Sequence, residues 1–138
     1  MRQLVVGFAD VGTAHEAVRQ AVFLARSLGA GLHVVTAIED DSTDIVRMGT
    51  DEWQVSDSEF AESAIRNFMD PLATDIAYTV GVAEGSPGEV LVSEAERLEA
   101  DLIVVGNVRM QGLTRVLGSV GSSVIRHAPC SVLVVKTT

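Results

Sequence analysis

The sequence predicts an α/β fold, an open sheet of five parallel strands with helices on both faces. Short apolar runs alternate along the chain with stretches of helical periodicity, as in successive strand–helix–strand units. The apolar runs show little polar alternation, which is typical of strands that are buried on both faces. Units of this kind join through right-handed crossovers, so we expect one layer of strands between two layers of helices.

The N-terminal part supplies the first of these units. A strand is predicted at 3–8, and the turn after it leads into a helix that starts near Thr13. Thr13 can cap this helix, and Glu16, three residues later, completes a capping box. Small and aliphatic residues then recur on one stripe until Gly29 ends the helix. The second strand is predicted at 32–38.

The middle of the chain is less regular. Residues 39–52 are acidic and lack periodicity, which predicts a surface loop. A helix is predicted from Ser56 to Met69, where Pro71 ends it. Residues 76–82 alternate in polarity, as an edge strand would. From Gly85 the next helix begins, with a serine as its cap and a proline at its first position.

A glycine-containing loop connects the fourth strand, predicted at 102–105, to a helix at 119–127, and a last strand follows at 132–135. Glycines let backbone N–H groups approach an anion closely, and the helix would direct its positive end to the same point. Ser119 adds a hydroxyl donor. The loop is therefore predicted to bind a phosphate. The alternative is an ordinary connection from strand to helix, because glycine is common in such turns.

The distribution of charge favours the phosphate. The chain has a net charge of −9, yet residues 102–138 contain four basic residues and no acid. A loop that receives an anion excludes carboxylates because a nearby like charge would oppose binding. The negative charge of the whole chain argues against binding to nucleic acid or to an anionic membrane.

Composition bounds the remaining possibilities. With 138 residues, of which 47% are hydrophobic, the chain is expected to form one domain over 1–138. No apolar run has the length of a membrane span or a signal peptide, so we expect a soluble, cytoplasmic protein. Cys130 is the only cysteine, and no spacing of histidine and cysteine suggests a metal site.

The common catalytic and phosphate-binding motifs are absent. The sequence contains neither G-x-x-x-x-G-K-[S/T] nor, in its first turn, G-x-G-x-x-G. It also lacks the nucleophile elbow G-x-S-x-G, and His127 lies about two helical turns from Ser119, too far to act as its base. We therefore expect no enzyme, or at most weak ATP hydrolysis.

Several stretches together resemble the universal stress protein family, and the resemblance covers essentially the whole chain. The matching stretches are 28–35, 84–89, 100–107, 117–120 and 126–135. The resemblance implies a Rossmann-like sheet of strand order 3-2-1-4-5. It also implies a homodimer, which we expect to form through the edge strand Val132–Val135. Members of the family divide into ATP-binding and non-binding groups.

The ATP-binding group shares a pattern of Gly, two residues, Gly, nine residues, Gly and Ser or Thr. This sequence departs from that pattern: Arg109 takes the place of the second glycine, and eight residues separate it from Gly118. Ala9 replaces the aspartate that typically ends the first strand, with Asp10 displaced by one residue. The resemblance places a nucleotide site at the following residues: Phe8, Ala9, Asp10, Ala37, Gly106, Asn107, Arg109, Gly112, Gly118, Ser119 and Val120.

In this site the phosphates and ribose would lie along the glycine loop and the base near Ala37. The resemblance implies an adenine nucleotide, ATP with Mg²⁺ as an accompanying ion or else AMP, and a role as a stress-response sensor or regulator. Cyclic AMP is a second possibility, because some actinobacterial relatives that share the opening Gly106-Asn107 are associated with a cyclic nucleotide. The third is a dimeric interaction module that binds no nucleotide.

Overall fold

Five parallel strands form the central sheet. The computed structural model describes residues 1–9, 12–39, 43–48, 51–107 and 118–137, with the backbone alone for 12–13, 43–48, 51–55 and 119. The sheet has the order β5-β2-β1-β6-β7, which confirms the predicted 3-2-1-4-5 arrangement. Its strands are β1 (Gln3–Gly7), β2 (Gly31–Ile38), β5 (Tyr78–Glu84), β6 (Leu102–Gly106) and β7 (Ser131–Val135).

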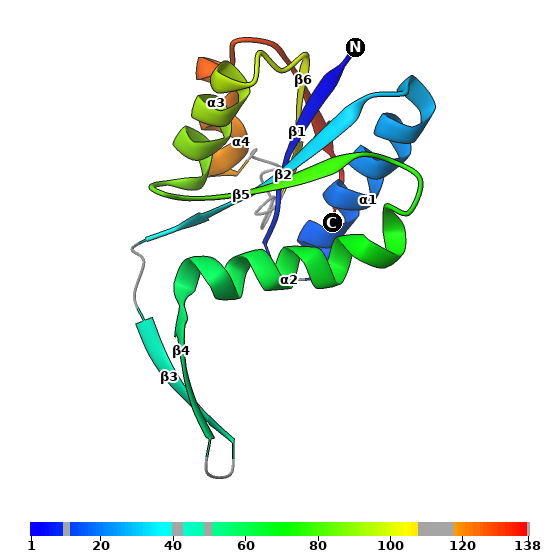
Figure 1. Cartoon of the computed structure of the whole chain (residues 1–138). Helices are drawn as coiled ribbons and strands as arrows, with labels where there is room; N and C mark the ends of the chain where they lie inside the picture. The colour runs from blue at the N-terminus through cyan, green and yellow to red at the C-terminus, as the bar shows by residue number, and fades with distance from the viewer. Residues whose placement is uncertain (10–11, 40–42, 49–50, 108–117, 138) are drawn as a thin grey trace.

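Helices cover both faces of this sheet, as the sequence predicts (Figure 1). On one face lie α1 and α2, and on the other α3 and α4. Among the described residues, no helix is both long enough and apolar enough to cross a bilayer. The helices are α1 (Gly12–Leu28), α2 (Asp57–Leu72), α3 (Pro87–Arg97) and α4 (Ser119–His127).

The core is divided by the sheet into two clusters because successive side chains of a strand point to opposite faces. In β1, Leu4 and Val6 belong to the cluster under α1 and α2, whereas Val5 belongs to the cluster under α3 and α4. All three side chains are fully buried. Full burial of one such side chain is worth about 1.5–3 kcal/mol, so an aliphatic strand with both faces covered is strongly held in place.

The ends of α2 and α3 agree with the sequence prediction only in part. The helix predicted from Ser56 begins at Asp57, and Ser56 caps it, since Ser56 Oγ accepts a hydrogen bond from the Glu59 N–H. That helix runs through Pro71 to Leu72. Proline has no backbone N–H, but in the last turn of a helix this removes only one of the final backbone hydrogen bonds, so the cost is small. Pro87 is the first residue of α3 as predicted, but Ser86 makes no side-chain capping bond. The side chain of Thr13 lies outside the described residues.

The predicted surface loop at 39–52 is wrong over much of its length. A two-stranded antiparallel sheet, β3 (Thr43–Met48) and β4 (Asp51–Ser56), occupies this part of the chain. Its register runs from Thr43 opposite Ser56 to Met48 opposite Asp51. Figure 1 shows the hairpin projecting beyond the end of α2, separate from the main sheet. The backbone hydrogen bonds between two paired strands do not require a buried face, so an acidic composition does not prevent this hairpin from forming.

Candidate functional site

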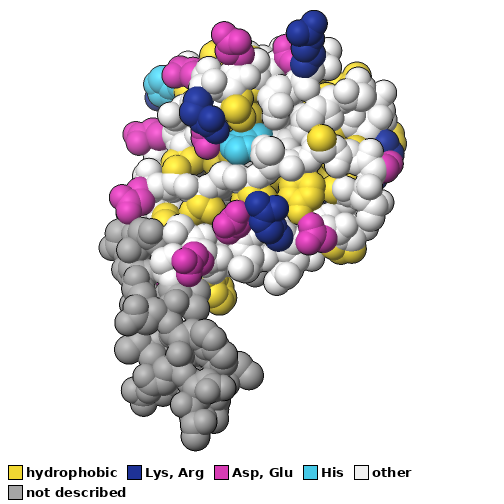
Figure 2. Space-filling view, in the orientation of Figure 1, with side chains coloured by type: hydrophobic (Ala, Val, Ile, Leu, Met, Phe, Trp, Pro, Cys, Tyr) yellow, Lys and Arg dark blue, Asp and Glu magenta, His cyan; other side chains and the backbone are white. Residues whose placement is uncertain are grey.

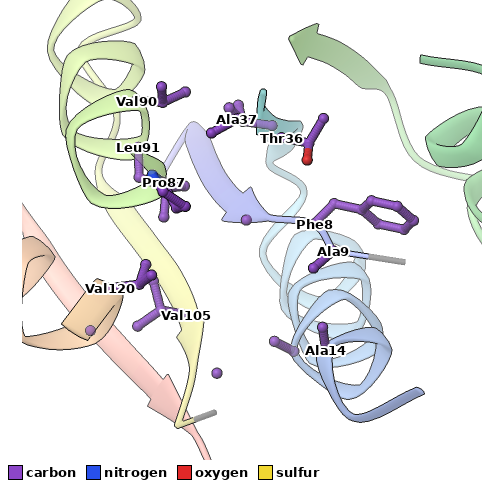
Figure 3. A pocket seen from close by; sticks show the side chains of 15 residues that line it. Phe8, Ala9, Ala14, Thr36, Ala37, Pro87, Val90, Leu91, Val105 and Val120 are labelled. Carbon is purple, nitrogen blue, oxygen red and sulfur yellow. The ribbon is translucent and has the colours of Figure 1, made fainter. Parts of the chain in front are cut away.

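A cavity of about 410 Å³ lies at the carboxyl ends of the central strands (Figure 3). Here the chain order of the sheet reverses, because β1 pairs with β2 on one side and with β6 on the other. Ligands of open α/β sheets bind at this kind of crevice. The lining residues are Gly7, Phe8 and Ala9 after β1, Val35, Thr36 and Ala37 of β2, Val105 and Gly106 of β6, Ala14 and Ala17 of α1, Pro87, Val90 and Leu91 of α3, and Val120 and Gly121 of α4.

The end of β1 is held firmly against β2. The Phe8 N–H donates a hydrogen bond of 2.8 Å to the Val35 carbonyl. The Phe8 ring packs against His15 and Phe68, with centroids 5.6 and 5.8 Å away, and Figure 3 shows it directed away from Leu91 across the cavity. Phe8 therefore presents its backbone and the base of its side chain to the cavity, while its ring anchors that wall to α1 and α2.

Two helices begin at the opposite wall. Pro87 of α3 and Val120 of α4 both line the cavity, so the first turns of both helices lie beside it. The first N–H groups of a helix have no partner inside the helix, and the helix dipole makes this end electropositive. The first turn of α4 carries no acid, whereas its last turn holds Arg126 and His127. The α4 side of this wall is therefore suited to a negative charge, whereas the first turn of α3 holds Glu89.

Close packing keeps the two helix starts together. A Cβ at Gly88 would lie 2.8 Å from Ser123 Oγ and 2.9 Å from Ser123 Cβ. Only glycine allows the first turn of α3 to approach α4 this closely. This contact gives a physical reason for Gly88, which lies in a segment that the sequence indicated both as a helix start and as part of the family resemblance.

A partly buried polar network joins β2 to β5 and α3. His33 Nδ1 is 2.6 Å from Thr79 Oγ1, and its Nε2 is 3.3 Å from Glu94 Oε1. A hydrogen bond from Arg97, with a smaller contribution from His33, lowers the pKa of the Glu94 carboxyl below its ordinary value despite partial burial. His33 is thus a packed residue with hydrogen-bond partners.

Five of the predicted site residues meet at the cavity: Phe8, Ala9, Ala37, Gly106 and Val120. Gly118 is the buried residue before the first turn of α4, and its carbonyl accepts a hydrogen bond of 2.9 Å from the Ser122 N–H. Asp10, Arg109 and Gly112 lie outside the described residues, as does the side chain of Ser119.

Asn107 is also buried, but it is not among the lining residues. Its Oδ1 accepts hydrogen bonds from the N–H and the hydroxyl of Thr137, at 2.7 and 2.8 Å, and its own N–H donates to the Val135 carbonyl. In this structure Asn107 therefore fastens the C-terminal strand to β6.

Sequence reasoning missed Thr36 and the α3 residues of the cavity. The topology carried a signal for them, because residues at the carboxyl ends of β1, β2 and β6 converge once the strand order is known. The described lining contains no ionisable side chain, so its chemistry is apolar contact and hydrogen bonding. Within the described ranges, no group of three histidine, cysteine or acidic side chains could hold a metal ion.

Comparison with known proteins identifies the family. The family model described as "Universal stress protein family" matches residues 1–136. The chain belongs to this family. Its curated relatives include a universal stress protein of Synechocystis, 37% identical over 87 residues that make up 62% of this chain and 81% of the relative. A Staphylococcus aureus protein of the same family is 31% identical over 142 residues, with 92% and 81% covered.

Solved structures of universal stress proteins share the fold. A crystal structure of a universal stress protein in complex with cAMP superposes with a TM-score of 0.77 at 27% identity, covering 99% of this chain and 98% of that one. The sheet order and the helices on both faces are thus those of the family, as the resemblance implied. On the face shown in Figure 2, described acidic and basic side chains are interspersed.

Proposed function

We propose that this universal stress protein binds an adenine nucleotide in the cavity between β1, β2, β6 and the starts of α3 and α4. The observation that carries the proposal is the cavity itself, with about 410 Å³ of space and apolar walls. Its volume falls within the range of about 300–1,000 Å³ that is common for small-molecule sites. A purine offers two flat apolar faces to such walls, and its polar edge can pair with the backbone at the strand ends.

The two ends of the cavity suit different parts of a nucleotide. The first turn of α4, represented by Val120 and Gly121, offers backbone N–H groups and a positive dipole end to phosphate. The ends of β1 and β2 form the other wall, with Ala9, Thr36 and Ala37. A nucleotide whose phosphate rests on α4 therefore has its base against β2.

ATP is our leading ligand, with Mg²⁺ as its accompanying ion, because residues 102–138, which include the first turn of α4 at the phosphate end, contain no acid. Cyclic AMP is the second candidate, since the relative with a TM-score of 0.77 was crystallised with it. In either case the protein would act as a nucleotide-dependent regulator. The described lining offers no acid or base for catalysis, in keeping with binding as the proposed activity.

Two measurements test the proposal. Purified protein is heated and the supernatant analysed for released nucleotide, and unliganded protein is titrated calorimetrically with ATP, ADP, AMP, cyclic AMP and, as a base control, GTP. An Ala9→Trp variant, which fills one wall of the cavity, should lose binding at least about tenfold. Its matched control is Ala77→Trp, at another exposed alanine outside the cavity lining. If no nucleotide is released or bound, the nucleotide-free interaction module replaces this proposal.

We further propose that two copies pair through β7. This strand lies at one edge of the described sheet, and Leu133 leaves 37% of its surface exposed there. An unpaired apolar edge favours pairing with a second copy across a two-fold axis. Sedimentation should give a dimer at micromolar concentration, and Leu133→Lys should shift it to monomer. A parent protein that sediments as a monomer under these conditions would contradict the pairing.

A further inference from the structure

Thr36 differs from every other described residue of the cavity. The remaining lining side chains are aliphatic or aromatic, or absent in the glycines, so the Thr36 hydroxyl is the single side-chain heteroatom in the described lining. Figure 3 shows this oxygen on the side of Thr36 that faces the end of β1 at Phe8. Among the described residues, no hydrogen bond to the hydroxyl is found.

A ligand that fills the cavity displaces water from this hydroxyl. Polar groups removed from water without a partner are destabilising, whereas a ligand atom that pairs with the hydroxyl removes the penalty. Phe8, on the side that the oxygen faces, has no polar side-chain atom. No described residue pairs with the hydroxyl, so its hydrogen-bond partner is a ligand or water.

The position of Thr36 on β2 decides which part of the ligand it meets. Thr36 and Ala37 form the wall opposite the first turn of α4, which is suited to phosphate. Adenine presents a ring nitrogen acceptor and its 6-amino donor on each of its two polar edges. The amino group is common to both edges, so it faces Thr36 whichever edge is turned toward β2.

We propose that Thr36 recognises the base, with its hydroxyl oxygen accepting a hydrogen bond from the 6-amino group of adenine. This inference rests on the proposed function and adds the residue that reads the base. Phosphate and ribose are held elsewhere in the cavity. Thr36 thus contributes to affinity only for ligands that carry the amino group.

The test compares Thr36→Val, which keeps the side-chain shape but removes the hydroxyl, with Thr36→Ser, which keeps the hydroxyl. Thr74→Val, at an exposed threonine after α2, is the matched control. Thermal unfolding establishes that each variant is folded. Calorimetric titration with AMP should show a loss of about two- to tenfold for Thr36→Val, as expected for one neutral hydrogen bond. Thr36→Ser and Thr74→Val should bind as the parent does.

Two AMP analogues locate the contact. With 2′-deoxy-AMP the loss in Thr36→Val should persist, because the ribose hydroxyl is not the partner. With purine riboside 5′-monophosphate, which lacks the 6-amino group, parent and variant should bind equally. The inference is overturned if folded Thr36→Val binds AMP as the parent does, if the loss vanishes with the deoxy analogue, or if it persists with the purine riboside. Failure of the parent to bind any adenine nucleotide would instead overturn the proposed function and this inference with it.

Discussion

Replacing Gly88 by alanine tests how closely α3 and α4 must approach at the cavity. The added Cβ would lie 2.8 Å from Ser123 Oγ and 2.9 Å from Ser123 Cβ. Ordinary contact begins near 3.4 Å, so the two helix starts must separate by roughly 0.5 Å or the side chain of Ser123 must rotate away. Rotation relieves only the contact with Oγ, because Cβ is fixed by the backbone.

The expected cost follows from two opposing effects. Overpacking by one methyl group costs about 1–3 kcal/mol. Alanine is favoured over glycine in a helix by up to about 1 kcal/mol, which offsets part of that cost. With the middle of the overpacking range, about 2 kcal/mol, and an offset of about 0.5–1 kcal/mol, the net loss of unfolding free energy is about 1–1.5 kcal/mol. This corresponds to a decrease of about 3–6 °C in Tm for a domain of this size. Nucleotide affinity should also fall, since both helices begin at the cavity.

Urea and thermal unfolding of four proteins check this reasoning: the parent, Gly88→Ala, Ser123→Gly and the double variant. Ser123→Gly removes both atoms of the clash, so Gly88→Ala should be neutral or stabilising in that background. The reasoning is refuted if Gly88→Ala is as stable as the parent, or if it costs the same in both backgrounds. Either result would mean that α3 and α4 separate without strain.

Three further predictions concern the site and the acid range. Ala9→Asp should tighten ATP binding about tenfold in calorimetry, by supplying a charge-assisted hydrogen bond to the adenosine; unchanged affinity would mean that this position does not face the adenosine. Gly118→Val should stay folded, because φ −60° and ψ 163° are open to valine, yet lose at least about tenfold in ATP affinity; full binding by the folded variant would exclude the start of α4 as the phosphate site. Hydrogen bonds from the Arg2 and Gln3 N–H groups lower the pKa of Asp101 below its ordinary 3.8. The contribution of the Asp101 carboxylate to folding stability is thus complete above that value and is lost as the pH falls through the lower pKa of the folded state. The difference in urea midpoint between the parent and Asp101→Asn should therefore shrink on acidification below about pH 4. A difference that stays constant would contradict this prediction.

The strands of the main sheet could be predicted because their buried residues follow one another in the sequence. Residues 102–105 are all buried, and a short unbroken aliphatic run is typical of a strand that is covered on both faces. The hairpin β3–β4 could not be found in this way. Its strands pair with each other and not with the main sheet, so no core imposes a hydrophobic period on them. The acidic side chains also lower the mean hydropathy of the segment, which obscures its β-branched residues.

The candidate site was predictable in part for a related reason. Phe8, Ala37 and Gly106 follow from the strand ends and the family pattern, and all three line the cavity. Asn107 belongs to the same pattern, but its amide reaches Thr137, thirty residues later, a contact that no local pattern encodes. Gly88 shows the same limit, because its role depends on Ser123 of another helix.

The pairing of β1 has a consequence for synthesis of the chain on the ribosome. β1 is made first and can pair early with β2, but its other neighbour is β6, with Leu4 opposite Leu102. The central strand of the sheet therefore keeps one ladder edge open until residues 102–106 have been made. During that interval a nascent chain exposes an aliphatic edge to chaperones or to neighbouring nascent chains. Because α4 comes later still, the cavity is among the last parts of the molecule to form.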